Sequence, residues 1–337
     1  MKYKLLGNSG LRVSELSLGT MTFGTEWGWG CDYETSKKIF DTYANAGGNF
    51  IDTANRYTEG TSEKMVGEFI NSDRDHFVLA TKYTLFDKKD SVNFSGNNRK
   101  NLFRSVEDSL DRLDTDFIDL LWVHAWDFTT PVEEVMRGLN DLVSSGIVHY
   151  IGISDTPAWI VSQANTIAEF RGWAKFSALQ IEYSLIERTV ERELMPMAKA
   201  LNLGVTPWAP LGGGVLTGKY LKNEPGRIEK DNPRLNEKNT KIAKEVVAIA
   251  KELNVSPGQV ALNWTRQQNQ QVIPIVGATK VSQLEDSLGC LNFEIPEKQM
   301  ACLNEVSKIE LGFPHEFLQA DYIKDIIFGG MQDQIER

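Results

Sequence analysis

Three ionisable residues each stand near the end of a short apolar run, and a tyrosine follows the first of them closely. Asp52, Lys82 and His124 close successive runs along the chain, and Tyr57 lies five residues after Asp52. A single residue of this kind is usually the solvated start of a loop. Three in succession, with a tyrosine nearby, are typical of a functional site.

These four side chains suit proton transfer to a carbonyl group. A tyrosine has a pKa near 10 in water, so it is a poor acid or base at neutral pH. A neighbouring lysine ammonium favours the phenolate and is expected to lower the pKa of Tyr57. Asp52 would orient the lysine and keep it charged, and an N–H of His124 could hold the carbonyl oxygen. No nucleophile with an adjacent base is evident.

The elements that must position these residues alternate along the chain. Short apolar runs, which predict strands, occupy 15–20, 49–54, 77–82, 117–124, 148–154, 176–183, 204–210 and 272–277. Helical patterns between and after them occupy 33–46, 62–71, 98–112, 131–145, 157–170, 190–201, 240–252 and 281–289. Eight βα units in about 300 residues predict an α/β fold of the closed (β/α)8 TIM-barrel type. An open doubly wound sheet is the competing arrangement.

Three segments depart from this regular pattern. The first ten residues, with the turn signal Gly7–Gly10, predict an N-terminal β-hairpin. A long loop over 211–239 follows the seventh strand, and 296–337 forms a C-terminal extension with a helix near 297–308. No linker rich in Pro, Gly or Ser divides the chain, so we expect one domain over 1–337.

The ionisable set lacks an electron source, which points to a cofactor. Loops after the seventh and eighth strands are the usual phosphate sites of this barrel. Here they read PLGGGVLTGK from Pro210 and GATK from Gly277, each rich in glycine and ending in a lysine. The spacing is not a Rossmann fingerprint, because the third glycine of G-x-G-x-x-G would fall on Thr217.

Composition excludes several other classes of protein. The net charge of −10 and a pI near 5.1 argue against general binding of nucleic acid or of an anionic membrane. No apolar run approaches the ~20 residues of a membrane span, and the first residues lack a signal-peptide pattern. Three dispersed cysteines indicate a reducing compartment, so we expect a cytoplasmic protein. Four scattered histidines disfavour a metal-dependent barrel hydrolase, and no metal site is expected.

The chain resembles the aldo-keto reductase family over nearly its whole length. The stretches that carry the resemblance are LGNSGLRVSELSLGTMTFG, NFIDTANRYTEGTSE, LDRLDTDFIDLLWVH, IGIS, LQIEYSLIER, TPWAPLGGGVLTGKY and PIVGATKVSQLEDSL. They are most similar to the aryl-alcohol-dehydrogenase-like branch, which is related to the potassium-channel β-subunits.

The resemblance implies an NADP(H)-dependent carbonyl reductase with Asp52, Tyr57, Lys82 and His124 as catalytic tetrad and Tyr57 as general acid. It also implies a set of cofactor-binding residues, in which Asp52 is included. The others are Thr20, Met21, Ser154, Gln180, Trp208, Pro210, Leu211, Gly212, Lys219, Gly277, Thr279, Lys280, Gln283 and Asp286.

Two positions differ from many members of the family. Asp155 stands where many members have asparagine, and a carboxylate can accept from a carboxamide N–H but cannot donate to its oxygen. Gln283 stands where many have an arginine for the 2′-phosphate, as it also does in the branch that this chain resembles. Lys280 is the nearby cation, so NADP(H) is the expected cofactor and NAD(H) the alternative.

Aromatic residues gather in the loops after the first, third and fourth strands. They are Trp27, Trp29, Tyr83, Phe86, Trp126 and Phe128. Some of them would pack loops against the barrel, but together they predict an apolar pocket for an aromatic or apolar aldehyde or ketone. The alternative function is a regulatory, cofactor-binding subunit resembling the channel β-subunits. The physiological substrate, the favoured direction and the oligomeric state stay open, and the sequence permits a homo-oligomer without indicating one.

Overall fold

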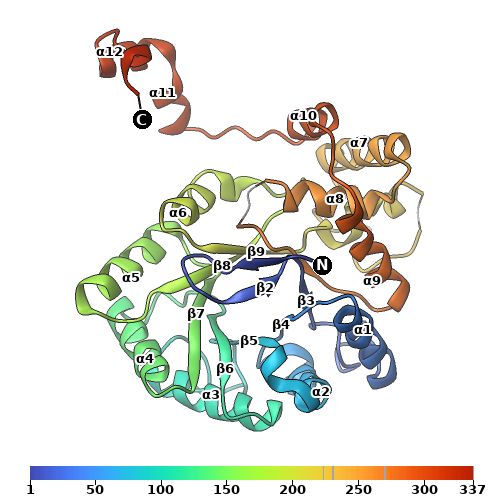
Figure 1. Ribbon diagram of the computed structural model, residues 1–337, viewed down its shortest axis with the longest axis vertical. Helices are drawn as coiled ribbons and strands as arrows, with labels where there is room; N and C mark the ends of the chain where they lie inside the picture. Colours follow the sequence, from blue (N-terminus) through green and yellow to red (C-terminus); the bar gives the residue numbers. More distant parts are fainter. Residues whose placement is uncertain (223, 230, 269–270, 337) are drawn as a thin grey trace.

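A computed structural model describes residues 1–222, 224–229, 231–268 and 271–336. Eight parallel strands form one sheet in the order β10-β3-β4-β5-β6-β7-β8-β9. Their bounds are β3 Ser17–Gly19, β4 Phe50–Asp52, β5 Val78–Tyr83, β6 Ile118–Val123, β7 Val148–Ser154, β8 Phe176–Glu182, β9 Gly204–Trp208 and β10 Ile275–Val276. A parallel bridge between Val205 and Val272 joins the two edges, so the sheet closes into the predicted barrel (Figure 1).

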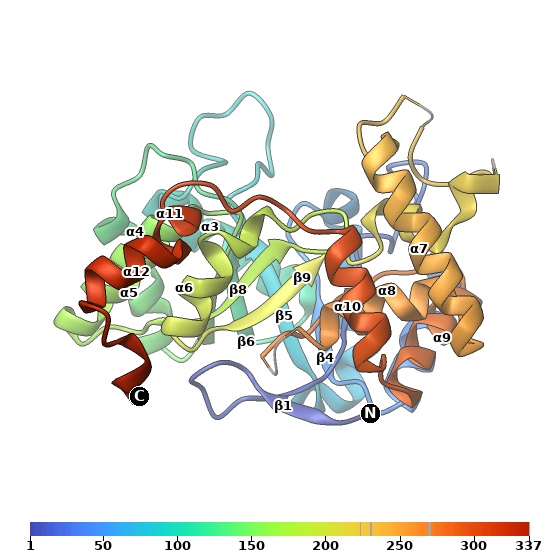
Figure 2. The same cartoon turned by 90° about the horizontal axis from the view of Figure 1, so that it is seen from above.

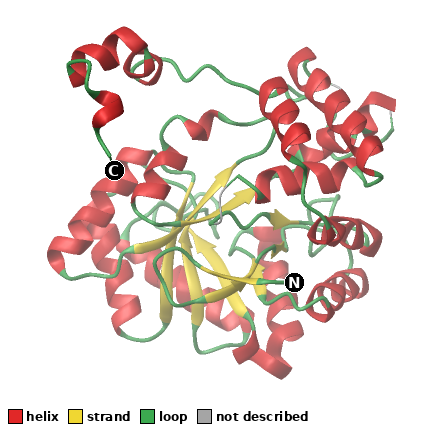
Figure 3. Ribbon diagram, turned by 45° about the horizontal axis from the view of Figure 1, so that its top comes forward, coloured by secondary structure: helices red, strands yellow, loops and turns green. Residues whose placement is uncertain are grey.

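Helices cover the outside of the barrel, as the view coloured by secondary structure shows (Figure 3). They are α1 Tyr33–Asn45, α2 Thr61–Ile70, α3 Arg99–Leu113, α4 Val132–Ser144, α5 Ala158–Arg171, α6 Leu194–Ala200, α7 Glu237–Leu253, α8 Pro257–Arg266, α9 Val281–Leu288 and α10 Glu297–Val306. The predicted (β/α)8 fold is therefore confirmed, with α10 in the C-terminal extension, where a helix was expected.

Two helices, rather than the single one expected, lie between β9 and β10. Helix α8 lies deep between its neighbours, since seven of its ten residues, from Gly258 to Thr265, are buried. Its start is marked locally by a capping box, in which Ser256 and Gln259 exchange hydrogen bonds with each other's backbone. The expected loop over 211–239 also contains two short 3-10 turns, Gly212–Thr217 and Lys219–Lys222.

The N-terminal hairpin closes one end of the barrel. Strand β1 (Tyr3–Leu5) pairs antiparallel with β2 (Arg12–Ser14), so the second strand lies beyond the first ten residues. Leu6 and Val13 are fully buried and join the inward-facing cluster that includes Phe50 and Trp122. Figure 2 shows the hairpin at one end of the barrel and the long loops rising from the opposite end. The hairpin end of the barrel is therefore closed, and the loop end is the one left open to a ligand.

Trp122 fills the centre of the barrel because its neighbour on β7 is a glycine. Gly152 pairs in register with Trp122, and a Cβ built on Gly152 would lie 2.4 Å from the indole ring. Any larger residue would therefore have to displace this fully buried ring. The ring forms a floor for the residues above it on the same strands.

Candidate active site

The alternation of strand residues explains why polar side chains meet in the barrel. On β5, Val78 and Ala80 belong to the inward-facing cluster, so Lys82, two residues further, faces the same way. The same step of two leads from Phe50 to Asp52 on β4 and from Ala178 to Gln180 on β8. His124 follows Trp122 by two residues, just after β6. Parallel strands bring all four to the loop end of the barrel.

Lys82 is the centre of the site. Its ammonium donates to Asp52 Oδ2 at 2.6 Å, to the carbonyl oxygen of Thr53 at 2.8 Å and to the Tyr57 hydroxyl at 3.1 Å. Its side chain is 0% exposed and that of Asp52 is 3% exposed. Burial lowers the pKa of Lys82, but the charge of Asp52 and the Tyr57 hydroxyl outweigh it and raise that pKa. The lysine is therefore a cation whose three N–H groups are all used.

Tyr57 reaches this ammonium from a 3-10 turn, Tyr57–Gly60, directly after β4. Its hydroxyl oxygen accepts from Lys82, so its own hydrogen is free to point into the site. Burial raises the pKa of Tyr57, Lys82 acts in the opposite direction, and the charges of Asp52 and Asp155 add to the rise. Lys82 lowers the pKa of Tyr57, as the sequence predicts, but burial raises that pKa by more. The expected net lowering of the Tyr57 pKa is therefore not found.

His124 stands beside the tyrosine. The two rings lie 6.0 Å apart with nearly perpendicular planes. Burial, with a smaller contribution from Lys82, holds the pKa of His124 well below its ordinary value. Its Nδ1 is buried and has no hydrogen-bond partner among the described residues. The imidazole is therefore neutral and can offer one N–H to a ligand.

On the other side of Asp52, Ser154 and Trp208 end β7 and β9, and Gln180 lies on β8 between them, two residues before the end of that strand. Ser154 is buried and pairs in register with Gln180, whose amide N–H donates to Asp52 Oδ1 at 2.9 Å. Asp155 adopts a left-handed backbone with φ of 42°, and its Oδ1 accepts from the Trp208 indole N–H at 3.1 Å. The carboxylate thus braces the Trp208 ring, which is partly exposed at the rim.

The loops expected to bind phosphate lie beside this rim. Gly212 has a positive φ of 58°, and a Cβ built on the exposed Gly277 would meet only the Gly19 oxygen at 3.6 Å. Helix α9 begins after Lys280 with no side chain capping its free N–H groups. Gly212 is buried and its N–H donates to the Ala209 oxygen, so the open backbone is that of Gly277. Together with the N-terminus of α9 and the exposed Lys280 it suits a phosphate group. This donor set fits a dinucleotide phosphate.

Other residues of the predicted cofactor set have protein partners. The Thr20 hydroxyl is buried and bonded to Ser62 and to the backbone of Asp52. Gln283 accepts from Thr279, and Asp286 accepts from Ser256 and Gln259 and so ties α9 to α8. Met21, Pro210, Leu211 and Lys219 lie in the loops after β3 and β9. The Thr20 and Asp286 side chains therefore support the loops from behind.

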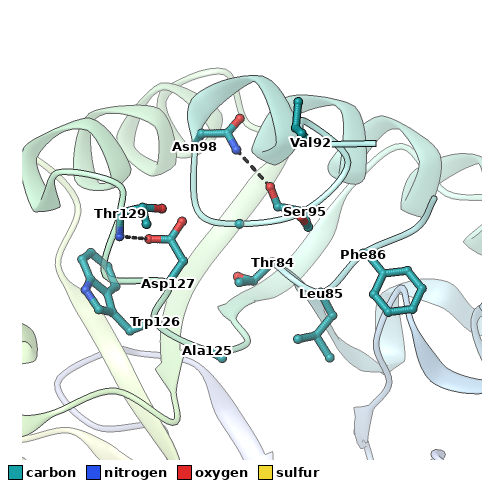
Figure 4. A pocket seen from close by; sticks show the side chains of 11 residues that line it. Thr84, Leu85, Phe86, Val92, Ser95, Asn98, Ala125, Trp126, Asp127 and Thr129 are labelled. Carbon is teal, nitrogen blue, oxygen red and sulfur yellow. Dashed lines mark hydrogen bonds between the residues drawn. The ribbon is translucent and has the colours of Figure 1, made fainter. Parts of the chain in front are cut away.

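Four of the six predicted aromatic residues lie around the site in two pairs, Trp27 with Trp29 and Phe86 with Trp126. Trp27 contacts both Trp29 and Tyr57, with ring centroids 5.6 and 6.4 Å apart. Trp126 lines a pocket of about 430 Å³ with Leu85 and Phe86, between the loops after β5 and β6 (Figure 4).

The remaining two aromatic residues lie apart from these. Tyr83 is 1% exposed and packs in the outer core with Leu102 and Val106, because it faces away from the barrel interior, opposite to Lys82. Phe128 is 69% exposed.

Two arginines near these aromatic rings have no signal in the sequence. The Arg56 guanidinium lies 4.4 Å from the Phe86 ring and 5.9 Å from the Trp27 ring. The Arg227 guanidinium lies 4.1 Å from the Trp29 ring. Arg227 is about 200 residues from Trp29 in the chain, so only folding brings the two together.

Within the described residues, no group of three or more His, Cys, Asp or Glu side chains could hold a metal ion. In the same part of the chain, no helix combines the length and the apolar character needed to cross a bilayer.

Comparison with known proteins agrees with the geometry. The model of the aldo/keto reductase family matches residues 15–308. Norsolorinic acid reductase of Aspergillus flavus is 39% identical over 324 residues, covering 93% of this chain and 83% of that protein. The aryl-alcohol dehydrogenase [NADP(+)] of Phanerodontia chrysosporium is 38% identical, and the match covers 93% of this chain and 87% of that protein. An aryl-alcohol dehydrogenase of Pestalotiopsis microspora is 37% identical, and the match covers 98% of this chain and 86% of that protein. The protein is thus an oxidoreductase, and the chain belongs to the aldo/keto reductase family.

Proposed function

We propose that residues 1–337 act as one NADP(H)-dependent enzyme that interconverts an aldehyde or ketone and its alcohol, with Tyr57 as general acid and base. The observation that carries this proposal is the bonding of Lys82. Its three N–H groups are taken by Asp52, Thr53 and Tyr57, so the tyrosine hydrogen must point away from the lysine. That hydrogen is therefore free to reach a carbonyl oxygen in the site.

Each residue of the tetrad then has one role. Tyr57 gives its proton to the carbonyl oxygen, and Lys82 stabilises the phenolate that remains. Asp52 holds the ammonium in place from the opposite side. Neutral His124 donates an N–H to the same oxygen and orients it toward Tyr57. In alcohol oxidation the phenolate takes the proton back.

The nicotinamide cofactor, when bound, supplies or accepts the hydride. Ser154 and Gln180 would hold its carboxamide, Trp208 would pack against its ring, and the loops at Gly212 and Gly277 would hold its phosphates. Lys280 at the start of α9 would pair with the 2′-phosphate and favour NADP(H) over NAD(H). The name of the Phanerodontia relative, which specifies NADP(+), supports the same preference.

The substrate we propose is an aromatic or apolar carbonyl compound. Trp27 lies beside the Tyr57 ring, and Trp126 follows His124 by two residues. Flat apolar walls of this kind suit an aryl group better than a charged sugar phosphate. The names of the relatives, which refer to aryl alcohols and to norsolorinic acid, point in the same direction.

The test is the absorbance of reduced nicotinamide during incubation with a panel of aromatic, aliphatic and charged aldehydes, with NADPH and NADH in parallel. We expect oxidation of NADPH to be fastest with the aromatic aldehydes, and a Tyr57→Phe variant serves as the matched control. Tight binding of NADPH without turnover of any aldehyde would instead support the regulatory-subunit alternative.

A further inference from the structure

The chain continues beyond α10 into a segment that lies apart from the barrel. We call residues 309–336 the C-terminal arm. It contains α11 (His315–Gln319), α12 (Asp321–Phe328) and a final 3-10 turn, Gln332–Gln334. Figures 1 and 3 show the arm projecting from the barrel at the end of an extended connection.

The arm exposes an unusual amount of apolar surface. Eight large apolar side chains are between 44% and 83% exposed. They are Phe313, Phe317, Leu318, Tyr322, Ile326, Ile327, Met331 and Ile335. In the described residues, the aromatic rings of the arm contact only one another, in the pairs Phe313–Phe317 and Phe317–Tyr322. Helix α12 has no buried residue.

The base of the arm is held on the barrel, so the arm leaves from a fixed point. The Arg192 guanidinium donates two hydrogen bonds to the backbone oxygen of Glu310, at 3.2 and 2.9 Å. His315 lies 3.2 Å from the carboxylate of Glu193. Both partners precede α6. These contacts use the polar groups of the arm and leave its apolar side chains without cover.

A second apolar surface lies on the outside of the barrel, on α5. Trp159 is 65% exposed and Phe170 is 86% exposed. They are eleven residues apart, which is close to three helical turns, so they lie on one face. The exposed or half-exposed residues between them on this side are Ser162, Gln163, Thr166 and Ile167, and the exposed Glu169 lies at its edge beside Phe170. We call Trp159, Ser162, Gln163, Thr166, Ile167 and Phe170 the α5 face.

We propose that the C-terminal arm docks on the α5 face of a second copy of this chain, in a reciprocal exchange. Taking roughly 150–250 Å² for a large side chain, the eight apolar side chains of the arm expose on the order of 800 Å². This summed area matches the share of one partner in an interface of standard size.

A second copy accounts for both surfaces at once. Every copy carries one arm and one α5 face. A two-fold dimer therefore covers both arms and both faces and leaves no such surface free to bind a third copy. The α5 face itself holds no charged residue; the exposed Glu169 lies at its edge, where its carboxylate can stay in contact with water when the arm docks. A barrel with an uncovered arm would instead leave both apolar surfaces in water.

The test uses the full-length chain and sedimentation velocity at about 50 µM, since interfaces of this size have dissociation constants from micromolar downwards. The wild type should sediment as a dimer of the 37.9 kDa chain. The arm variant Ile326→Glu/Ile327→Glu and the face variant Phe170→Glu should each raise the dimer dissociation constant about 100-fold or more. These side chains are exposed, so the variants should keep the wild-type circular dichroism spectrum. Leu5→Glu, at a side chain 56% exposed on β1, is the matched control and should remain dimeric.

A mixture of the arm variant with the face variant tests the exchange itself. A mixed dimer keeps one intact arm seated on one intact α5 face, so the mixture should contain more dimer than either variant alone. A monomeric wild type would overturn the proposal, as would a Phe170→Glu variant that dimerises like the wild type. A mixture with no more dimer than its components would also overturn the reciprocal exchange.

Discussion

Replacing Lys82 by methionine tests the electrostatic centre of the site. The change keeps a side chain of similar length and removes the cation that lies 3.1 Å from the Tyr57 hydroxyl. Lysine lowers the pKa of Tyr57 while burial raises it, so the loss of Lys82 should raise that pKa further. Alcohol oxidation needs the phenolate, and its rate rises with pH through this pKa. The rising limb should therefore move to higher pH in the variant.

The same substitution should destabilise the fold by a calculable amount. The Asp52 carboxylate is 3% exposed and would lose its cation in this variant. It would keep the hydrogen bond from the uncharged Gln180 amide, at 2.9 Å. Removing one partner of a buried ion pair costs about 3–5 kcal/mol. With an unfolding entropy of about 2.1 cal/mol/K per residue, a chain of this length should lose about 4–7 °C in Tm.

The two effects can be separated with the double variant Asp52→Asn/Lys82→Met. No uncompensated charge is then buried, so much of the lost Tm should return. The rising limb of the pH–rate profile for alcohol oxidation should still lie at higher pH than in the wild type, because Lys82 acts on the pKa of Tyr57 more strongly than Asp52 does. The assay is oxidation of an aryl alcohol from pH 7 through the ordinary tyrosine pKa of about 10 to the highest pH at which circular dichroism shows both proteins folded, under conditions where hydride transfer limits the rate. Since burial already raises the pKa of Tyr57, the window covers the lower part of the rising limb, where the variant should be slower than the wild type at each pH. An unchanged limb in the single variant would refute the role of Lys82.

Three further substitutions probe the site at other points. Tyr57→Phe should lower carbonyl reduction by about 10²–10⁴ while NADPH binding stays near normal; a variant with more than about a tenth of wild-type turnover would exclude Tyr57 as the acid. Lys280→Ala should weaken NADPH by up to about fivefold, as expected for an exposed ion pair, and leave NADH unchanged; titration of nicotinamide fluorescence measures both. Asp155→Ala and Trp208→Phe each remove the same 3.1 Å hydrogen bond. Both should weaken NADPH binding, and the double variant should lose less than the sum of the two single losses, while Asp155→Asn, which keeps an acceptor, should bind NADPH like the wild type.

The sequence alone determined the class of fold and the main catalytic candidates. The eight apolar runs alternate with helical patterns, and the structure places a strand on each of them. Asp52, Lys82 and His124 could be predicted because each interrupts an apolar run at the end where barrel strands carry their functional residues. Helix α8 was missed although local residues mark its start, Ser256 and Gln259 as a capping box with Pro257 at the first helical position.

Only the tertiary structure decided which way each side chain faces and which distant groups meet. Tyr83 and Lys82 are neighbours in the chain, yet one packs against the helices and the other faces the barrel interior, because successive strand residues point to opposite faces. The direction in which the pKa of Tyr57 shifts depends on how deeply the barrel buries this side chain, and the local sequence does not reveal that burial. The contact of Arg227 with Trp29 joins loops far apart in the chain, where only closure of the barrel brings them together.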